Sequence, residues 1–508
     1  MATTARAGTK NVILALTCAA QFMVVLDVAI VNVALPSIQR DLGVSQSTLQ
    51  WVVIAYGLML GGFLLFGGRL ADLLGRRRIL LTGLTIFTGA SFLAGISPSI
   101  GLLIAARGVQ GFGAALVAPA ALSILAVTFS EGQERNRSLG IYGAVGGTSA
   151  TVGVIASGLL TDGPGWRWVF FINVPVGIVL IGLATVFLLA DRAQRGAARF
   201  DVAGATTVTG GLLLLVYALN RGADYGWTSA STLVLFGAAA LLLAAFVRVE
   251  ARASHPLVPA SALRNRTLVA ANLSAFFTFS AFFSFIFLGS LLMQQVLGYS
   301  ATQTGVSWLA TSVTAFIASA FTGAQLVGRF GVRRLLITGL SLLAIGVLWL
   351  TRVPADADYV TDLLPALLLA GVAIGLCAPS VQIGALSGVT DAATGLAAGL
   401  VETMREIGGA AGVAAVSTVL VSQVGLDGFH AAFLVICIAG ALGALVATVA
   451  FERRARSAES PAVEPGPEMD VPAGAEVLVP VPVPVDDGPD ARTRGVRRGT
   501  APGTPTSL

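Results

Sequence analysis

The stretch GGRLADLLGRRR, Gly67 to Arg78, separates two apolar runs, and a related stretch, GAQLVGRFGVRR, occurs at Gly323 to Arg334. Their alignment pairs two glycines, one leucine and two arginines in the same order. A similar shift places residues 146–147, both glycine, on residues 408–409, also both glycine. The pattern predicts a chain built from two related halves.

The composition is that of an integral membrane protein. Of 508 residues, 55% are hydrophobic and only 11% are charged, and the mean hydropathy is +0.85. The apolar runs are about 20 residues long, which is the length that an α-helix needs to cross a bilayer. Alternating stretches of about ten residues, typical of a membrane barrel, are missing from the sequence. We therefore expect an all-α membrane protein.

Fourteen membrane-spanning helices are predicted, arranged as two six-helix halves with two additional helices between them. The expected regions are a cytoplasmic N-terminus at 1–10, a first half at 11–190, the additional pair at 200–250, a second half at 268–451 and a disordered cytoplasmic tail at 452–508. The helices are expected to begin near Asn11, Thr48, Ile79, Gly101, Ser138, Val169, Val202, Ser231, Leu268, Thr304, Leu335, Leu363, Ala398 and Phe429.

The basic residues indicate the orientation of these helices. Loops on one side contain clusters such as residues 76–78 and 333–334, which are all arginine. Loops on the other side contain only Arg40, Arg167, Arg221 and Arg352. Because inner loops of membrane proteins are rich in Lys and Arg, both termini are predicted to be cytoplasmic.

Charged residues inside the predicted spans are expensive and indicate functional sites. Asp27 and Arg107 are expected at similar depth in the outer half of the first and fourth spans. Burial favours a protonated carboxyl group and a nearby guanidinium favours an ionised one, so a balance that changes with conformation suits a proton carrier. Two alternatives remain: a static ion pair, or direct contact between Asp27 and a cationic substrate.

A second charged cluster, in LVETMREIGGAAG, lies in the span that begins near Ala398. Glu402 and Glu406 share one helix face, and Arg405 is three residues from Glu402. The cluster is either a further titratable site or a charge network near a helix end.

Several motifs together resemble the major facilitator superfamily, in its fourteen-helix drug:proton antiporter branch. LDVAIVNVALP, RGVQGFGAAL and WRWVFFINVPVG match motifs of that branch in order. GGRLADLLGRRRILL resembles the superfamily's motif A, with Gly68, Asp72, Gly75, Arg76 and Arg77 in matching places. The antiporter motif C is matched only in part, because Val154 and Ser157 replace a proline and a glycine.

The resemblance implies that motif A is a cytoplasmic gate in which Asp72 bridges to a neighbouring helix. The alternative is a solvated topology signal. The second copy has Gly328 in place of the aspartate, so we expect this latch only in the first half. Polar residues within spans are candidates for lining a central substrate cavity: Gln21, Asn32, Gln110, Asn272, Gln294, Gln295 and Gln382.

The resemblance implies a proton-coupled exporter of amphipathic organic compounds in the inner membrane of a bacterium. No H-E-x-x-H or G-x-x-x-x-G-K-[ST] motif occurs, so we expect no enzyme activity, no ATP site and no cofactor or metal. The expected partners are a small molecule, protons and lipid, without nucleic acid, and the expected state is a monomer. Export or uptake of a specific metabolite is the alternative, and a sensor without transport is a third class.

Overall fold

Long apolar helices account for the regular structure in the computed structural model. It describes residues 7–189, 201–253, 256–259, 262, 264–423 and 425–451. Within these ranges the regular elements are helices, and none is a strand. The predicted tail, 452–508, lies outside the described residues, as do residues 1–6 of the predicted N-terminal segment.

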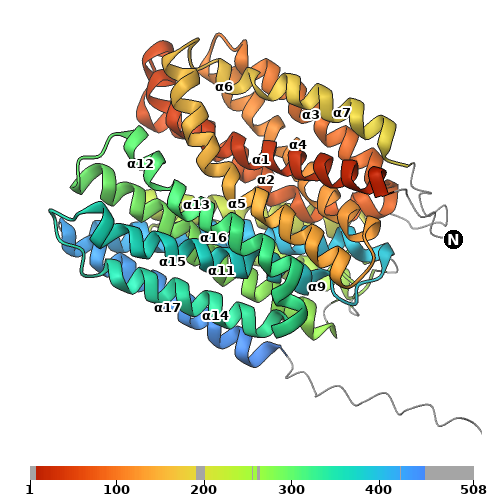
Figure 1. The fold of residues 1–508 in the computed structure, drawn as a ribbon. Helices are drawn as coiled ribbons and strands as arrows, with labels where there is room; N and C mark the ends of the chain where they lie inside the picture. The colour runs from red at the N-terminus through yellow and green to blue at the C-terminus, as the bar shows by residue number, and fades with distance from the viewer. Residues whose placement is uncertain are drawn as a thin grey trace, which may run out of the picture. The chain divides into compact units, whose positions relative to one another are not determined.

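The first group of helices, the N-terminal bundle, comprises α1 to α7. Helix α4 packs against both α2 and α3, and α1 packs along α5 (Figure 1). A break at Ile172 separates the single turn of α6 from α7. The bounds are α1 Ala7–Leu42, α2 Gln46–Leu74, α3 Arg76–Gly95, α4 Ile100–Thr128, α5 Gln133–Asp162, α6 Trp168–Phe171 and α7 Asn173–Phe187.

The second group, the C-terminal bundle, comprises α11 to α17. Helix α11 packs against α16, and α14 packs against α15 and α17. The bounds are α11 Arg266–Leu291, α12 Ala301–Ser307, α13 Leu309–Phe321, α14 Val327–Leu350, α15 Leu364–Leu386, α16 Thr394–Ser422 and α17 Leu426–Ala450, with π-helical turns at Leu292–Val296, Thr322–Leu326 and Tyr359–Leu363 and a 3-10 turn at Asp391–Ala393.

The two bundles meet along α2 with α16 and along α5 with α13. Glycines allow these close approaches. A side chain at Gly68 would overlap the backbone of Gly395, and one at Gly140 would overlap Gly323. Small residues at such crossings let helix backbones approach closely in membranes. The interface between the bundles therefore depends on glycines in both repeats.

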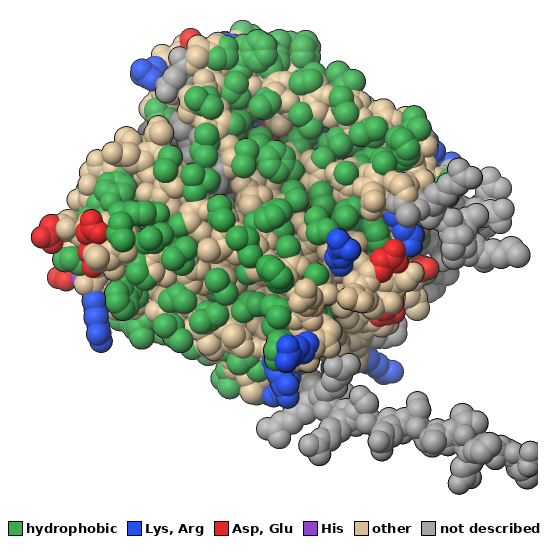
Figure 2. All heavy atoms as spheres, viewed as in Figure 1, with side chains coloured by type: hydrophobic (Ala, Val, Ile, Leu, Met, Phe, Trp, Pro, Cys, Tyr) green, Lys and Arg blue, Asp and Glu red, His purple; other side chains and the backbone are tan. Residues whose placement is uncertain are grey.

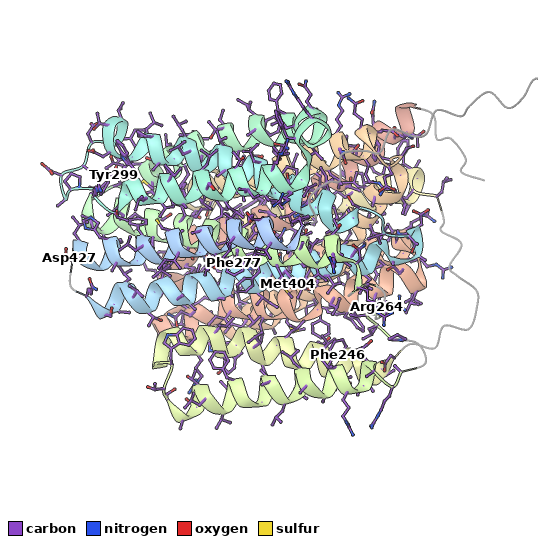
Figure 3. All side chains as sticks on the ribbon, turned by 90° about the horizontal axis from the view of Figure 1, so that it is seen from below. Phe246, Arg264, Phe277, Tyr299, Met404 and Asp427 are labelled. Carbon is purple, nitrogen blue, oxygen red and sulfur yellow. The ribbon has the colours of Figure 1, made fainter. Side chains whose placement is uncertain are left out.

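Helices α8 (Val202–Tyr225) and α9 (Ala230–Glu250) form a hairpin beside this interface. Helix α8 packs against both α2 and α16. Phe246 of α9 and Met404 of α16 join one apolar cluster, and Figure 3 shows the hairpin along one side of the bundles. The predicted additional pair thus contacts both bundles rather than only one.

The outer surface of the bundles is apolar. Figure 2 shows hydrophobic side chains covering the visible face, with charged side chains gathered towards its edges. Large side chains such as Val186, Leu189, Leu241 and Val449 are exposed. A surface of this kind would be a severe aggregation liability in water, and it suits contact with lipid chains.

Twelve helical segments of the described chain are long and apolar enough to cross a membrane. The predicted count of fourteen is therefore not confirmed. Two features explain why twelve spans are counted instead of fourteen. Helix α5, rich in Gly, Ser and Thr, is not among the twelve, and residues 302–350 count as one span of 49 residues although Trp308 and Gly331 interrupt its helical backbone.

Candidate functional site

Asp27 of α1 and Arg107 of α4 form a buried ion pair. Their side chains are 0% and 1% exposed, and Arg107 Nη1 lies 2.5 Å from Asp27 Oδ2. The predicted common depth of these two residues thus corresponds to direct contact. A charge left alone in this setting would be very costly, so each side chain supplies the counter-ion of the other.

Neutral amides complete the surroundings of the Asp27 carboxylate. Gln110 Nε2 lies 2.7 Å from Asp27 Oδ1 and 2.8 Å from Ser91 Oγ, and its Oε1 accepts a 2.7 Å hydrogen bond from Arg107. Asn173, the first residue of α7, donates to Oδ1 at 2.8 Å. The sequence prediction missed Asn173, although it lies in the motif WRWVFFINVPVG.

Helix α2 also contacts the Arg107 guanidinium. The Nε atom donates to the Val52 carbonyl oxygen at 3.0 Å, and the Tyr56 ring centroid lies 4.2 Å from the guanidinium carbon. The Phe170 ring lies farther away, at 5.9 Å. A guanidinium over an aromatic face gains cation–π attraction, which is strongest where water is excluded.

The second cluster, on α16, has two carboxylates around one guanidinium. Arg405 Nη1 lies 2.6 Å from Glu402 Oε2, and Arg405 Nη2 lies 2.9 Å from Glu406 Oε1. The Glu402 side chain is 2% exposed, whereas that of Glu406 is 23% exposed. With all three groups ionised, the cluster has a net charge of minus one, and Glu406 is its accessible member.

Two buried tyrosines of the N-terminal bundle lie near the α16 cluster. The Tyr142 hydroxyl donates to Gln21 Oε1 at 2.9 Å and is within electrostatic range of Glu402 and Arg405. The Tyr56 hydroxyl is within electrostatic range of Arg405 and Glu406. The structure therefore brings both charged clusters and Gln21 into one region, which the sequence could not show.

Motif A joins the two bundles at the predicted cytoplasmic end. Asp72, near the end of α2, accepts hydrogen bonds of 2.8 Å from the backbone N–H groups of Gly395 and Leu396. These groups belong to the first turn of α16, where unpaired N–H groups and the helix dipole favour a carboxylate. The contact is an N-terminal cap supplied by another helix.

Arg76 and Arg77 have different partners. Arg76 contacts Ser123 Oγ at 2.8 Å, Thr394 Oγ1 at 3.1 Å and the Asp391 carbonyl oxygen, so it joins the same junction. Arg77 donates to the carbonyl oxygen of Thr185, within the last turn of α7, at 2.7 Å. Gly75 has a φ of 100°, which glycine adopts at no steric cost.

The second copy of the loop repeats part of this geometry. Gly331 has a φ of 77°, like Gly75, and Arg333 donates to the Thr448 carbonyl oxygen at 2.7 Å, as Arg77 does to Thr185. Gly328 occupies the place of Asp72 and has no side chain to cap a helix. The internal repeat therefore includes the positive-φ glycine and the arginine that donates to a carbonyl oxygen, in both copies of the loop.

Among the hydrogen bonds of the described residues, none joins the other predicted cavity residues to the two clusters. Asn32 is exposed and donates to the Val28 carbonyl oxygen, whereas Asn272 donates to that of Leu268. Gln294 and Gln295 are exposed in the π-helical turn after α11, and Gln382 is buried in α15. Gln21 and Gln110 are the two of the seven whose side chains hydrogen-bond to the site, within the part of the chain that the structure describes.

Ser157 shows one consequence of the incomplete motif C. Its hydroxyl donates to the Ile30 carbonyl oxygen of α1 at 2.6 Å. Nearby, a side chain at Gly153 would meet Ala29 of α1. Helices α1 and α5 are thus held by a hydrogen bond at a place where the motif has glycine.

Comparison with known proteins identifies the family. The model of the Major Facilitator Superfamily matches residues 17–413 and also residues 271–496. The puromycin resistance protein of Streptomyces alboniger is 40% identical over 79% of this chain and 80% of its own length. The cephamycin export protein of Amycolatopsis lactamdurans is 37% identical over 82% of this chain and 86% of its own.

A solved structure shares the fold. The human organic anion transporter MFSD10 aligns with a TM-score of 0.64 at 16% identity, over 86% of this chain and 99% of its own. From the family match and the identity to the curated relatives, the chain belongs to the Major Facilitator Superfamily.

Proposed function

We propose that the protein exports amphipathic organic compounds, drugs or antibiotics, in exchange for protons. The observation that carries the proposal is the buried Asp27–Arg107 pair, with Asp27 surrounded by hydrogen-bond donors. Relatives named for puromycin resistance and cephamycin export support this class of substrate. The chain acts as a carrier and not as an enzyme, and it uses no ATP.

Asp27 is the proton carrier and Arg107 sets its proton affinity. When a proton neutralises the Asp27 carboxylate, Arg107 loses its counter-ion and must find another partner, so protonation and conformation are linked. Glu402, Arg405 and Glu406 form the corresponding titratable group of the other bundle. Glu406 is the member that a proton or a substrate reaches first.

Motif A is the cytoplasmic gate. Asp72 of α2 and Arg76 of α3 both bind the start of α16, while Gly68 permits the backbones of α2 and α16 to touch. Alternating access requires this junction to open when the cytoplasmic side is exposed. The cavity between the bundles receives the substrate, with Gln21, Asn32, Gln110, Asn272, Gln294, Gln295 and Gln382 as candidate lining residues.

Fourteen membrane crossings remain the proposed topology. The run over residues 302–350 has 49 residues, roughly 74 Å at 1.5 Å per residue, more than twice the hydrocarbon thickness, and Gly331 interrupts its helical backbone. Helix α5 has 30 residues, enough for one crossing. The proposed division is two six-helix halves at 11–190 and 268–451, with the hairpin at 200–250 between them.

The proposed setting is the membrane of a bacterium. We place the protein as a monomer in the inner membrane of a bacterium, in contact with lipid and with both termini in the cytoplasm. The basic clusters at 76–78 and 333–334 then lie on the inner side.

Transport into everted membrane vesicles tests the proposal. Puromycin is the first substrate to try, because a relative is named for resistance to it. Accumulation should disappear when the pH gradient is dissipated, and Asp27→Asn should abolish gradient-driven accumulation. Asp41→Asn is the matched control, since Asp41 is an exposed carboxylate on the same helix. Puromycin accumulation that stays the same when the pH gradient is dissipated would refute proton coupling.

A further inference from the structure

Helix α2 is the element shared by the two contacts on which the proposed cycle depends. Towards α4 it holds Arg107, through the Val52 carbonyl oxygen and the Tyr56 ring. Towards α16 it makes close approaches at Gly68 and at Leu64, whose carbonyl oxygen would lie 3.0 Å from a side chain at Gly399. A movement between the bundles therefore acts on the same helix that holds Arg107.

Tyr56 occupies the junction of these two contact surfaces. It is 2% exposed, and its hydroxyl donates to the Val24 carbonyl oxygen of α1 at 3.3 Å. Its ring covers Arg107, and a side chain at Gly61, on the same helix, would lie 3.9 Å from the Glu406 Cβ atom. The stacking of the Arg107 guanidinium on the Tyr56 ring indicates a role for this tyrosine beyond filling space.

We propose that Tyr56 is a positioning residue whose ring holds the Arg107 guanidinium on Asp27, so that movement of α2 against α16 changes the proton affinity of Asp27. This inference rests on the proposed role of Asp27 and adds the part that transmits conformation to it. When α2 shifts, the Tyr56 ring and the Val52 carbonyl shift together, and Arg107 loses two of its contacts at once.

Few charged groups face the Asp27 carboxylate. Arg107 of α4 contacts it directly, Tyr56 of α2 is within electrostatic range, and Asn173 of α7 and Gln110 of α4 are neutral donors. Within the described part of the chain, no hydrogen bond or ion pair joins its side chain to α5 or α6. Tyr56 in turn contacts Arg107 with its ring, and its hydroxyl is within electrostatic range of Arg405 and Glu406. The position of Arg107 thus dominates the electrostatic surroundings of Asp27.

Carbodiimide labelling measures this effect without transport. Dicyclohexylcarbodiimide reacts with protonated carboxyl groups in apolar surroundings, so the labelled fraction of Asp27 can be followed by mass spectrometry across pH. The full-length protein in lipid nanodiscs is the sample. In Tyr56→Leu, Arg107 is less firmly held and the ionised carboxylate loses stabilisation. The midpoint of labelling should therefore move to higher pH by about one unit.

Conservative variants separate positioning from packing. Tyr56→Phe and Tyr56→Trp keep an aromatic face and should keep the wild-type midpoint. Tyr56→Met is a second non-aromatic variant, whose labelling midpoint should shift as that of Tyr56→Leu does and which replaces it if Tyr56→Leu folds poorly. Phe87→Leu removes another fully buried ring, on α3, and should leave the midpoint unchanged.

Two results would overturn the inference. One is a wild-type midpoint in both Tyr56→Leu and Tyr56→Met, and the other is an equal shift in Tyr56→Phe, which would assign the effect to the hydroxyl. Either result leaves the transport proposal standing. Conversely, efflux that is independent of the pH gradient would refute the transport proposal, while the shift in labelling would still establish the action of Tyr56 on Asp27.

Discussion

Replacing Asp72 by alanine should open the cytoplasmic junction. Asp72 accepts two hydrogen bonds of 2.8 Å from the first turn of α16. A hydrogen bond to a charged group contributes about 1.5 kcal/mol, and the cost of burying the carboxylate offsets part of the sum of two. A net contribution of about 2 kcal/mol remains, which corresponds to a change of roughly 30-fold in the ratio of closed to open molecules.

Spin labels at Gln133 and Ala392 report this change. Both residues are exposed and lie close in sequence to a contact between the bundles, where Glu131 accepts a hydrogen bond from the Gly388 N–H group at 3.3 Å. Double electron–electron resonance gives the populations of short and long distances, on a background in which the native cysteines are replaced. Asp72→Ala should move molecules from the short to the long distance.

Asp72→Asn is the graded control, because its amide oxygen retains one acceptor while the charge is lost. Its population should lie between those of the wild type and Asp72→Ala. A short-distance population in Asp72→Ala equal to that of the wild type would refute the gate, since the two hydrogen bonds would then contribute nothing to closure.

Three further predictions concern other parts of the molecule. Gly68→Ala should abolish transport because a side chain there overlaps α16, whereas Gly61→Ala, which meets only ordinary contacts, should retain it; equal activity in vesicles would contradict this. Arg405→Ala should lower the free energy of unfolding by about 3–5 kcal/mol because it leaves two carboxylates unpaired, and a melting temperature near that of the wild type would argue against the ion pairs. Hydrogen bonding by Arg167 lowers the pKa of Asp41. The ionised Asp41 therefore stabilises the folded protein above its unfolded pKa of about 3.9, and this contribution is lost as the pH falls through the folded pKa. The difference in melting temperature between Asp41→Asn and the wild type should vanish in strong acid.

Much of the architecture follows from patterns within the sequence. Apolar runs of the right length predict the helices, and the observed helices begin within a few residues of the expected positions for most of them. The rise per residue along two helices of opposite direction predicted a similar depth for Asp27 and Arg107, and the structure shows their side chains in contact. These features depend on local periodicity and on rise per residue, which a single sequence contains.

Other features depend on contacts that no local pattern encodes. The partner of Asp72 is the backbone of Gly395 and Leu396, which no side-chain pattern indicates. Asn173 and Tyr56 approach Asp27 and Arg107 only because α7 and α2 pack against α1 and α4. Polarity alone likewise does not show which predicted cavity residues face the same space: Gln294 and Gln295 are exposed in the π-helical turn after α11, whereas Gln382 is buried in α15.

Proton flux driven by substrate in reconstituted proteoliposomes tests the central claim most directly. With a pH-sensitive dye inside the vesicles, an inward puromycin gradient should drive protons outward through the wild type. Asp27→Asn should show no proton movement, because the carrier group cannot titrate, whereas Asp41→Asn should show the wild-type flux. Proton flux through Asp27→Asn equal to that of the wild type would contradict the assignment of Asp27 as the proton carrier.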